Sequence, residues 1–245
     1  MPKILALWAV PRSTSTAFEW MMRQRGDMTC FHEPFGEAWY QGEAPLWPRA
    51  TASSKRTPGL TLQSVRDHLF GLAEADAIFI KDFPHYIDHM WDDAFLSHFT
   101  HSFLIRDPAK TITSMFDKWP DFHKKEVGFS EQRMLFDRIT EMNGNPPPVL
   151  DSDDLLEDPV GMVRVWSEAV GIPFMESALS WEPGARDEVS WWDGGSFHAN
   201  LRNSDGLKPQ KRTYKEIGDV PDRVRTIYDE CLTHYRHLHA FRLKA

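Results

Sequence analysis

Two polar segments of the chain carry residues that could hold an anion. The first, residues 11–16 (Pro-Arg-Ser-Thr-Ser-Thr), is dense in hydroxyls and lies between an apolar run and a stretch with helical spacing. Unpaired N–H groups at a helix N-terminus favour negative charge, so this segment predicts a phosphate cradle. An ordinary Ser/Thr-rich helix cap is the alternative, and the segment alone does not decide between them. It contains no Gly and no GK[ST] sequence, which disfavours a standard ATPase.

The second segment places Arg106 eight residues before Ser114. Arg106 follows the apolar stretch 102–105, and Pro108 suits the first turn of a helix, so Ser114 falls about two turns into that helix. One bound anion could therefore contact both side chains. The competing interpretation is a surface ion pair between Arg106 and Asp107 beside a capping proline.

Hydrophobic periodicity indicates the elements that position these segments. Apolar runs predict buried strands at 4–9, 28–31, 77–81, 102–105 and 149–150. Helical spacing predicts helices at 16–25, 62–73, 86–96, from Pro108 onward, 158–170 and 220–238. This alternation implies βαβ crossovers and hence a three-layer α/β/α fold with a central parallel sheet. Ligands of such sheets bind beyond the carboxyl ends of the strands, which directs attention to the loops 10–16, 81–85 and 106–114.

Composition sets the class of protein. The 245 residues, 41% hydrophobic and 26% charged, predict one globular α/β domain over 1–245. The net charge of -8 argues against nucleic acid or membrane insertion, so an anionic ligand needs locally placed cations. The apolar N-terminal run is too short for a signal peptide or a membrane span, which predicts a cytoplasmic protein. Two cysteines are too few for a disulfide scaffold or a zinc site.

Together these segments resemble the sulfotransferases that use 3′-phosphoadenosine 5′-phosphosulfate (PAPS), which have a P-loop NTPase-like fold. Residues 11–16 are similar to that family's donor loop, Pro-[Lys/Arg]-Ser-x-[Ser/Thr]-[Ser/Thr]. Arg106 and Ser114 match its Arg-Asp-Pro signature with a Ser eight residues beyond the Arg. Residues 153–159 (Asp-Asp-Leu-Leu-Glu-Asp-Pro) are similar to its D-L-x-x-D-P helix start. The order of the three motifs within 4–173 makes the resemblance specific, and closer to bacterial and Golgi-type members than to cytosolic ones.

The resemblance implies an enzyme that transfers a sulfuryl group from PAPS to a hydroxyl or amine of a small acceptor, leaving the nucleotide PAP. The 3′-phosphate would lie on Arg106 and Ser114. The 5′-phosphosulfate would lie on the donor loop, through Arg12, Ser13, Thr14, Ser15 and Thr16. Cytosolic members have Lys in place of Arg12 and Gly in place of Thr14. Because Arg is not a proton donor, Arg12 would stabilise the departing phosphate electrostatically. No metal is expected, since PAPS carries no triphosphate and the sequence shows no dedicated carboxylate ligand set.

An acceptor must lose a proton as it attacks sulfur, which requires a base. Glu33 follows the second predicted strand, where some bacterial and Golgi-type relatives place a base-like Glu. His85 lies near the catalytic His of cytosolic members but is displaced from their Lys-x-His spacing, and Phe83 stands there instead. Glu33 is slightly favoured; the alternatives are a pair between Glu33 and Arg12 and a helix-capping role for His85. Lys81 could neutralise the transferred sulfuryl oxygens.

Two loops could cover such a site. The turn-rich segment 41–60 predicts a variable loop or lid. The segment 193–213 predicts a donor-covering loop in which Lys208, Lys211 or Arg212 reaches the 3′-phosphate, with a solvated loop as the alternative. Acceptor pockets of this fold are built from variable loops, here 36–60 and 119–145, so the identity of the acceptor stays open. The ten Trp residues slightly favour an apolar or cationic acceptor. A monomer and a homodimer are both compatible with the sequence.

Two rival functions also stay open. A P-loop-like small-molecule kinase shares the fold and a strand-loop-helix phosphate site, but the missing GK[ST] sequence counts against it. A catalytically silent nucleotide-binding module would keep the donor loops without a working base. Magnesium-dependent ATP turnover would favour the kinase, and PAP binding without turnover would favour the silent module.

Overall fold

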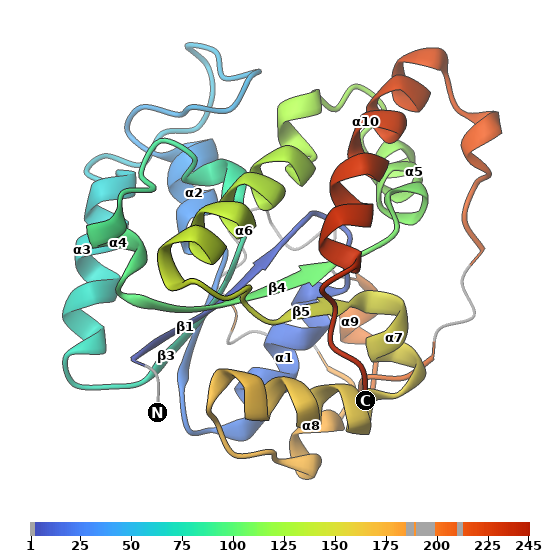
Figure 1. The fold of residues 1–245 in the computed structure, drawn as a ribbon. Coiled ribbons are helices and arrows are strands. Elements are labelled where there is room, and N and C mark those ends of the chain that lie inside the picture. The colour runs from blue at the N-terminus through green and yellow to red at the C-terminus, as the bar shows by residue number, and fades with distance from the viewer. Residues whose placement is uncertain (1–2, 185–188, 190–198, 210–212) are drawn as a thin grey trace.

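The centre of the molecule is a five-stranded sheet in which every strand is parallel to its neighbours. The computed structural model describes residues 3–184, 189, 199–209 and 213–245. The strand order is β2-β3-β1-β4-β5 (Figure 1). The strands are β1 (Ile4–Ala9), β2 (Thr29–His32), β3 (Ile78–Asp82), β4 (Phe99–Ile105) and β5 (Val149–Asp151). All five predicted strands are confirmed, and β4 begins three residues before the expected position 102.

Strand β1 lies in the middle because it is apolar on both faces. Each of its six residues is at most 1% exposed, which is the burial expected of a parallel strand covered by helices on both sides. In the register of the sheet, Trp8 lies beside Asp82 of β3 and Ala9 beside Leu104 of β4. The loops that follow β1, β3 and β4 therefore leave the same edge of the sheet, next to one another.

Helices cover both faces of this sheet (Figure 1). Helices α1 and α8 lie on one face, where Phe18 packs against Trp166, and α6 and α10 lie on the other. The longer helices are α1 (Ser15–Arg25), α2 (Pro34–Gln41), α3 (Leu62–Ala73), α5 (Pro108–Lys118), α6 (Phe129–Asn143), α8 (Pro159–Val170) and α10 (Asp222–His239). The short ones are α4 (Asp93–Leu96), α7 (Ser152–Glu157) and α9 (Ala199–Arg202). The three-layer α/β/α fold predicted from the alternation is confirmed.

The helix predicted over 86–96 is wrong. This stretch contains a 3-10 turn, Pro84–Tyr86, a run of tight turns and only the single-turn α4. The Met90 amide donates to the Ile87 carbonyl at 2.8 Å, and the Asp92 amide donates to the Met90 carbonyl at 2.9 Å. These local bonds replace the helical ladder, and the Asp92 carboxylate caps α4. The apolar residues whose spacing predicted a helix are instead side chains that these turns bury.

Two helices lie where variable loops were expected. Helix α2 occupies the first part of 36–60, and the 15-residue α6 occupies most of 119–145. The sequence does carry a signal for α6, since Phe129, Gln132, Leu135, Phe136 and Ile139 are its buried residues and glycines stand at both ends. The remaining segment 42–60 has no helix or strand and stays a candidate lid.

Arg49 fastens this segment to the loop before α6. Its guanidinium lies 3.9 Å from the centre of the Trp119 ring and donates to the carboxylates of Asp121 at 2.8 Å and Glu126 at 3.2 Å. A cation stacked on an aromatic face and paired with a buried carboxylate such as Glu126 is a strong local anchor. The two loops that the sequence assigns to an acceptor pocket are thus joined.

Candidate active site

The loop between β1 and α1 has an unusual backbone. Among the described non-glycine residues, only Arg12, Thr14 and Glu33 have positive φ angles, 65°, 72° and 44°. The left-handed conformation costs about 1–2 kcal/mol for a residue with a Cβ, and it persists only where the surrounding structure imposes it. Thr14, which replaces the glycine of the cytosolic pattern, takes the conformation that glycine favours. All three residues belong to the predicted site.

Contacts between distant parts of the chain bring the predicted anion-binding residues together. Arg12 Nε donates to Ser114 Oγ at 3.1 Å, and Arg106 Nη1 donates to the Arg12 carbonyl at 3.0 Å. Ser13 Oγ and Arg106 Nε are buried and have no hydrogen-bond partner within the part of the chain that the structure describes. Buried polar atoms are nearly always satisfied, so these two atoms fit a site that takes an anionic ligand.

Two further residues of this site were missed by the sequence analysis. Ser152 Oγ donates to the Ser13 carbonyl and to the Ile105 carbonyl, the latter at 2.9 Å, and so joins the donor loop to β4. Ser152 follows β5, so the rule of strand carboxyl ends could have found it. Tyr214 accepts from Arg106 Nη2 at 2.6 Å. No motif marks Tyr214, because only the path of the C-terminal segment brings it there.

The predicted C-terminal lid is described only in part. Lys208 is exposed and forms an ion pair with Asp205, 2.6 Å between Nζ and Oδ2. Lys211, Arg212 and residues 193–198 of the predicted loop lie outside the described residues. The role assigned to Lys208 stays a prediction.

A buried cluster of charges lies at the carboxyl ends of β2 and β3. Lys81 is fully buried, and its Nζ lies 2.5 Å from Glu33 Oε1 and 4.0 Å from Glu19 Oε2. His32 Nδ1 lies 2.6 Å from Glu19 Oε2, and His32 Nε2 lies 3.9 Å from Glu33 Oε1. The ion-pair partner of Glu33 is therefore Lys81 rather than Arg12, which the sequence left open. Glu19 and His32 were not singled out as site residues.

Burial and neighbouring charges shift the pKa values of two carboxyls, that of Glu19 in this cluster and that of Asp82 beside it. Burial raises the pKa of the Glu19 carboxyl, but its neighbours, His32 first, outweigh burial and lower the value to about 2. Burial, and then the charge of Glu33, raise the pKa of Asp82 well above its usual value. Asp82 accepts 2.8 Å hydrogen bonds from the amides of Phe35 and Phe83, and so ties the start of α2 to the end of β3.

His85 lies in a different environment from Glu33. It is fully buried among aromatic rings, with Tyr86 at 4.4 Å between ring centres, and neither ring nitrogen has a hydrogen-bond partner among the described residues. A Cβ at Gly128 would lie 2.4 Å from its Nδ1, so only glycine fits there. Burial, followed by the charge of Lys125, lowers the pKa of His85 to about 3. The capping bond that was its alternative role is not formed. Its role as a base stays a prediction.

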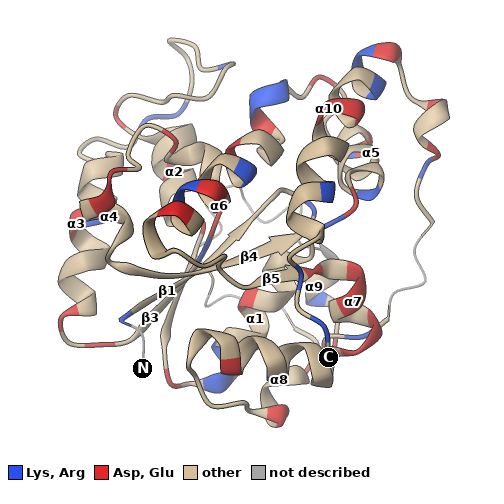
Figure 2. Cartoon of the chain, viewed as in Figure 1, with Lys and Arg blue, Asp and Glu red and all other residues tan. Residues whose placement is uncertain are grey.

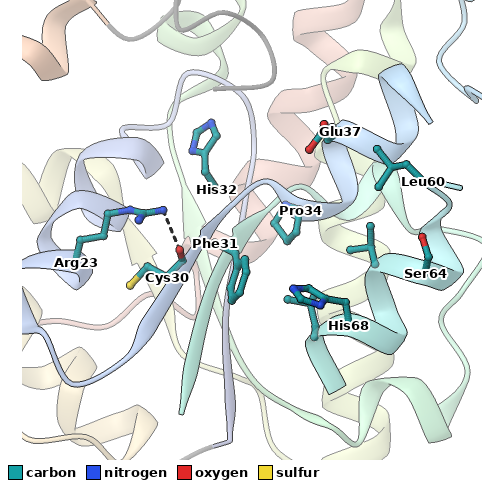
Figure 3. Close-up of a pocket in the computed structure, with 11 residues that line it drawn as sticks. Arg23, Cys30, Phe31, His32, Pro34, Glu37, Leu60, Ser64 and His68 are labelled. Atoms are coloured by element: carbon teal, nitrogen blue, oxygen red, sulfur yellow. Dashed lines mark hydrogen bonds between the residues drawn. The ribbon is translucent and has the colours of Figure 1, made fainter. Parts of the chain in front are cut away.

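A pocket of about 540 Å³ runs along the outer edge of β2 (Figure 3). Its lining combines apolar residues with the polar side chains of Arg23, His32, Glu37, Ser64 and His68. No residue of the donor loop lines it. It meets the charged cluster at His32 and at Arg23, which donates to the Cys30 carbonyl at 2.9 Å.

Figure 2 shows acidic and basic residues interspersed along the helices. No group of three His, Cys, Asp or Glu side chains is arranged to hold a metal in the described part of the chain. None of its helices combines the length and the apolar character that a membrane crossing requires.

Comparison with known proteins identifies relatives of the chain. A family model described as a sulfotransferase domain matches residues 2–218. Two Arabidopsis thaliana proteins, branched-chain-amino-acid aminotransferase-like proteins 2 and 1, are 26% and 24% identical to it over 239 and 244 residues. The matches cover 96% of this chain but only 42% and 43% of those proteins. The sulfotransferase domain of the Synechococcus PCC 7002 olefin synthase shares its fold, with a TM-score of 0.50 and 15% identity over 99% of this chain and 96% of that one.

Proposed function

Because the chain belongs to the sulfotransferase domain family, we propose that it transfers a sulfuryl group from PAPS to a hydroxyl or amine of a small acceptor. The membership predicted from three sequence motifs is confirmed. The observation that carries the proposed donor is the contact of Arg12 with Ser114 and of Arg106 with the Arg12 carbonyl. These contacts bring the side chains of Arg12, Arg106 and Ser114 together beside the N-terminus of α1.

The proposed donor fits the polar groups of this cradle. Ser13 Oγ and Arg106 Nε are buried without hydrogen-bond partners among the described residues, and both can donate to a phosphate or sulfate oxygen. The first N–H groups of α1 add a partial positive charge at the same place. The 5′-phosphosulfate would lie on residues 12–16, and the 3′-phosphate on Arg106 and Ser114.

The proposed chemistry requires a base and a stabilised leaving group. When bound, the donor supplies an electrophilic sulfur attached to a phosphate. Glu33 removes the proton of the acceptor as the acceptor atom attacks sulfur. Arg12, held in place by Ser114, stabilises the charge that develops on the departing phosphate oxygen. The fixed backbone of the donor loop keeps these groups in position before the reaction, which lowers the entropic cost of reaching the transition state.

Calorimetric titration with PAP, AMP and ATP with magnesium tests this proposal. PAP should bind in preference to AMP because Arg106 and Ser114 recognise the additional 3′-phosphate. The Arg106→Ala variant should lose this preference, and Arg66→Ala, which removes a surface cation of α3 paired with Asp67, is the matched control for nonspecific charge.

Selective PAP binding followed by sulfuryl transfer from PAPS to members of an acceptor panel would support the proposal. Stronger binding of ATP with magnesium would favour the kinase instead. Selective PAP binding without transfer to any acceptor would favour the silent nucleotide-binding module.

A further inference from the structure

We propose that Glu19 and His32 form a carboxylate–imidazole pair that receives the acceptor's proton from Glu33, with Glu19 as the positioning residue. The inference rests on the proposed sulfuryl transfer at this site and assigns a role to two residues outside the donor motifs. Glu19 belongs to α1 and His32 to β2, thirteen positions apart. Their side chains are each 2% exposed, so the pair is almost fully withdrawn from solvent.

The hydrogen bond between the two residues determines which nitrogen of His32 carries the proton. The pKa of Glu19 is lowered to about 2, so this side chain is a carboxylate at neutral pH and can only accept. His32 Nδ1, 2.6 Å from Glu19 Oε2, must therefore carry the hydrogen. In the neutral imidazole the lone pair then belongs to Nε2, the nitrogen that lies 3.9 Å from Glu33 Oε1.

Lys81 disfavours the protonated form of Glu33 as the end point of the proton transfer. The fully buried ammonium lies 2.5 Å from Glu33 Oε1, and protonation of Glu33 would remove its nearest counter-ion. A buried charge that loses its partner is strongly destabilising. If the proton moves on to His32, the pair of Lys81 with Glu33 is restored and the new imidazolium lies against the Glu19 carboxylate.

The step balances in protons and electron pairs. The acceptor O–H or N–H bond breaks and its proton goes to the Glu33 carboxylate as the acceptor atom bonds to sulfur. The bond between sulfur and the bridging oxygen breaks, and its electron pair stays on the phosphate. The Glu33 carboxyl then gives the proton to His32 Nε2, which a small rotation of the Glu33 side chain brings within hydrogen-bond distance. His32 also borders the pocket along β2, which offers the proton an exit to solvent.

Among the described residues, the charges around His32 are balanced before the proton arrives. Glu19 and Arg23 face it from α1, where Arg23 Nη2 lies 2.9 Å from Glu19 Oε1. Lys81, which lies beside His32 in the register of the sheet, faces it from β3, and Glu33 follows His32 itself. Two carboxylates and two cations therefore cancel, and the cluster gains one positive charge when His32 accepts the proton.

A purely structural role for Glu19 is the competing explanation, because its carboxylate also neutralises Arg23 and Lys81. Three variants separate the two explanations. Glu19→Gln keeps the size of the side chain but can also donate to Nδ1, and so mixes the tautomers of His32. His32→Asn keeps an N–H donor for Glu19 but has no equivalent of Nε2. Glu19→Asp keeps the charge and should restore part of the lost activity.

Two measurements test the proposal on the full chain. Nitrogen NMR of histidine-labelled protein, with the His32 signals assigned by their absence in His32→Asn, should show the Nδ1–H tautomer in the wild type and a mixture in Glu19→Gln. Steady-state kinetics with PAPS should show kcat lowered by about 100-fold in Glu19→Gln and in His32→Asn, with KM for PAPS unchanged. Circular dichroism verifies that each variant is folded.

The outcomes distinguish failure of the pair from failure of the proposed function. Normal kcat in a folded His32→Asn, while the wild type transfers sulfuryl groups, would overturn the role of the pair. An Nε2–H tautomer in the wild type would overturn it as well, and this result needs no turnover. Absence of transfer by the wild type would instead overturn the proposed sulfuryl transfer, whatever the tautomer.

Discussion

The donor loop and the buried charged cluster are both polar, but they satisfy their polar groups in different ways. In the cluster each charge has a partner inside the protein, such as Lys81 with Glu33 and His32 with Glu19. In the donor loop, Ser13 Oγ and the neighbouring Arg106 Nε lack hydrogen-bond partners among the described residues, although Arg106 Nε lies 4.0 Å from Asp153 Oδ1. The loop is organised to meet an anion from outside, whereas the cluster is organised to redistribute a proton within itself.

Removing one member of the cluster should have the largest effect on stability. Lys81→Met leaves Glu33 and Glu19 without their common buried cation, and we expect a loss of about 3–5 kcal/mol in the free energy of unfolding. Urea denaturation measures this value. The double variant Lys81→Met with Glu33→Gln should recover part of the loss, because the unpaired carboxylate is also removed. A loss in the single variant below about 1 kcal/mol would show that water reaches the cluster.

Removing Arg106, which contacts the donor loop, should affect ligand binding more than stability. We expect Arg106→Ala to weaken PAP binding by about 100-fold, equivalent to about 2.7 kcal/mol, because a charge-assisted contact to the 3′-phosphate is lost. Calorimetry measures the affinity. Arg66→Ala, on the surface of α3, should bind PAP like the wild type. Equal losses of PAP affinity in both variants would indicate a nonspecific attraction of PAP to positive charge and not a defined binding site.

His85 is a third kind of polar residue, because it is buried without hydrogen-bond partners in the described part of the chain. Its contribution to stability should depend on pH. Burial, and then Lys125, lower its pKa from 6.5 to about 3. Between these two pH values the unfolded chain binds a proton that the folded protein excludes. Stability should therefore be complete above about pH 6.5 and fall by up to about 1.4 kcal/mol per pH unit below it.

Urea denaturation at pH 7, 6 and 5 measures this slope, and His85→Leu should reduce it. The variant should be as stable as the wild type at pH 7, since an unpaired buried polar group is removed. An unchanged slope in the variant would assign the acid sensitivity to other groups.

The smallest expected effect concerns the backbone of the donor loop. Thr14→Gly removes a left-handed strain of about 1–2 kcal/mol but adds flexibility worth about 0.5–1 kcal/mol to the unfolded chain. We expect a net stabilisation of up to about 1.5 kcal/mol, measured by thermal unfolding. Thr16→Gly, inside α1, should instead destabilise the protein by a similar amount. Destabilisation by Thr14→Gly would show that the Thr14 side chain contributes more than its backbone costs.

Local patterns in the sequence predict a large part of the fold. The apolar run 4–9 predicts a central strand because helices must cover both faces of a parallel strand. The donor loop and the pair of Arg106 and Ser114 are recognisable because each is a short segment next to a predicted strand end. The wrong helix prediction at 86–96 has the same origin. Apolar spacing indicates which side chains are buried, and in this stretch turns bury them in place of one helix.

The chain by itself determines which segments become strands and helices and which short loops can bind an anion, because these properties depend on neighbours within a few residues. Only the tertiary structure decides the partner of Glu33, the approach of Tyr214 to Arg106 and the pairing of Glu19 with His32. Glu33 and Lys81 are 48 positions apart, and Arg106 and Tyr214 are 108 apart. Such contacts follow from sheet order and helix packing, and a hydrogen bond depends on differences of less than an ångström that no spacing rule contains.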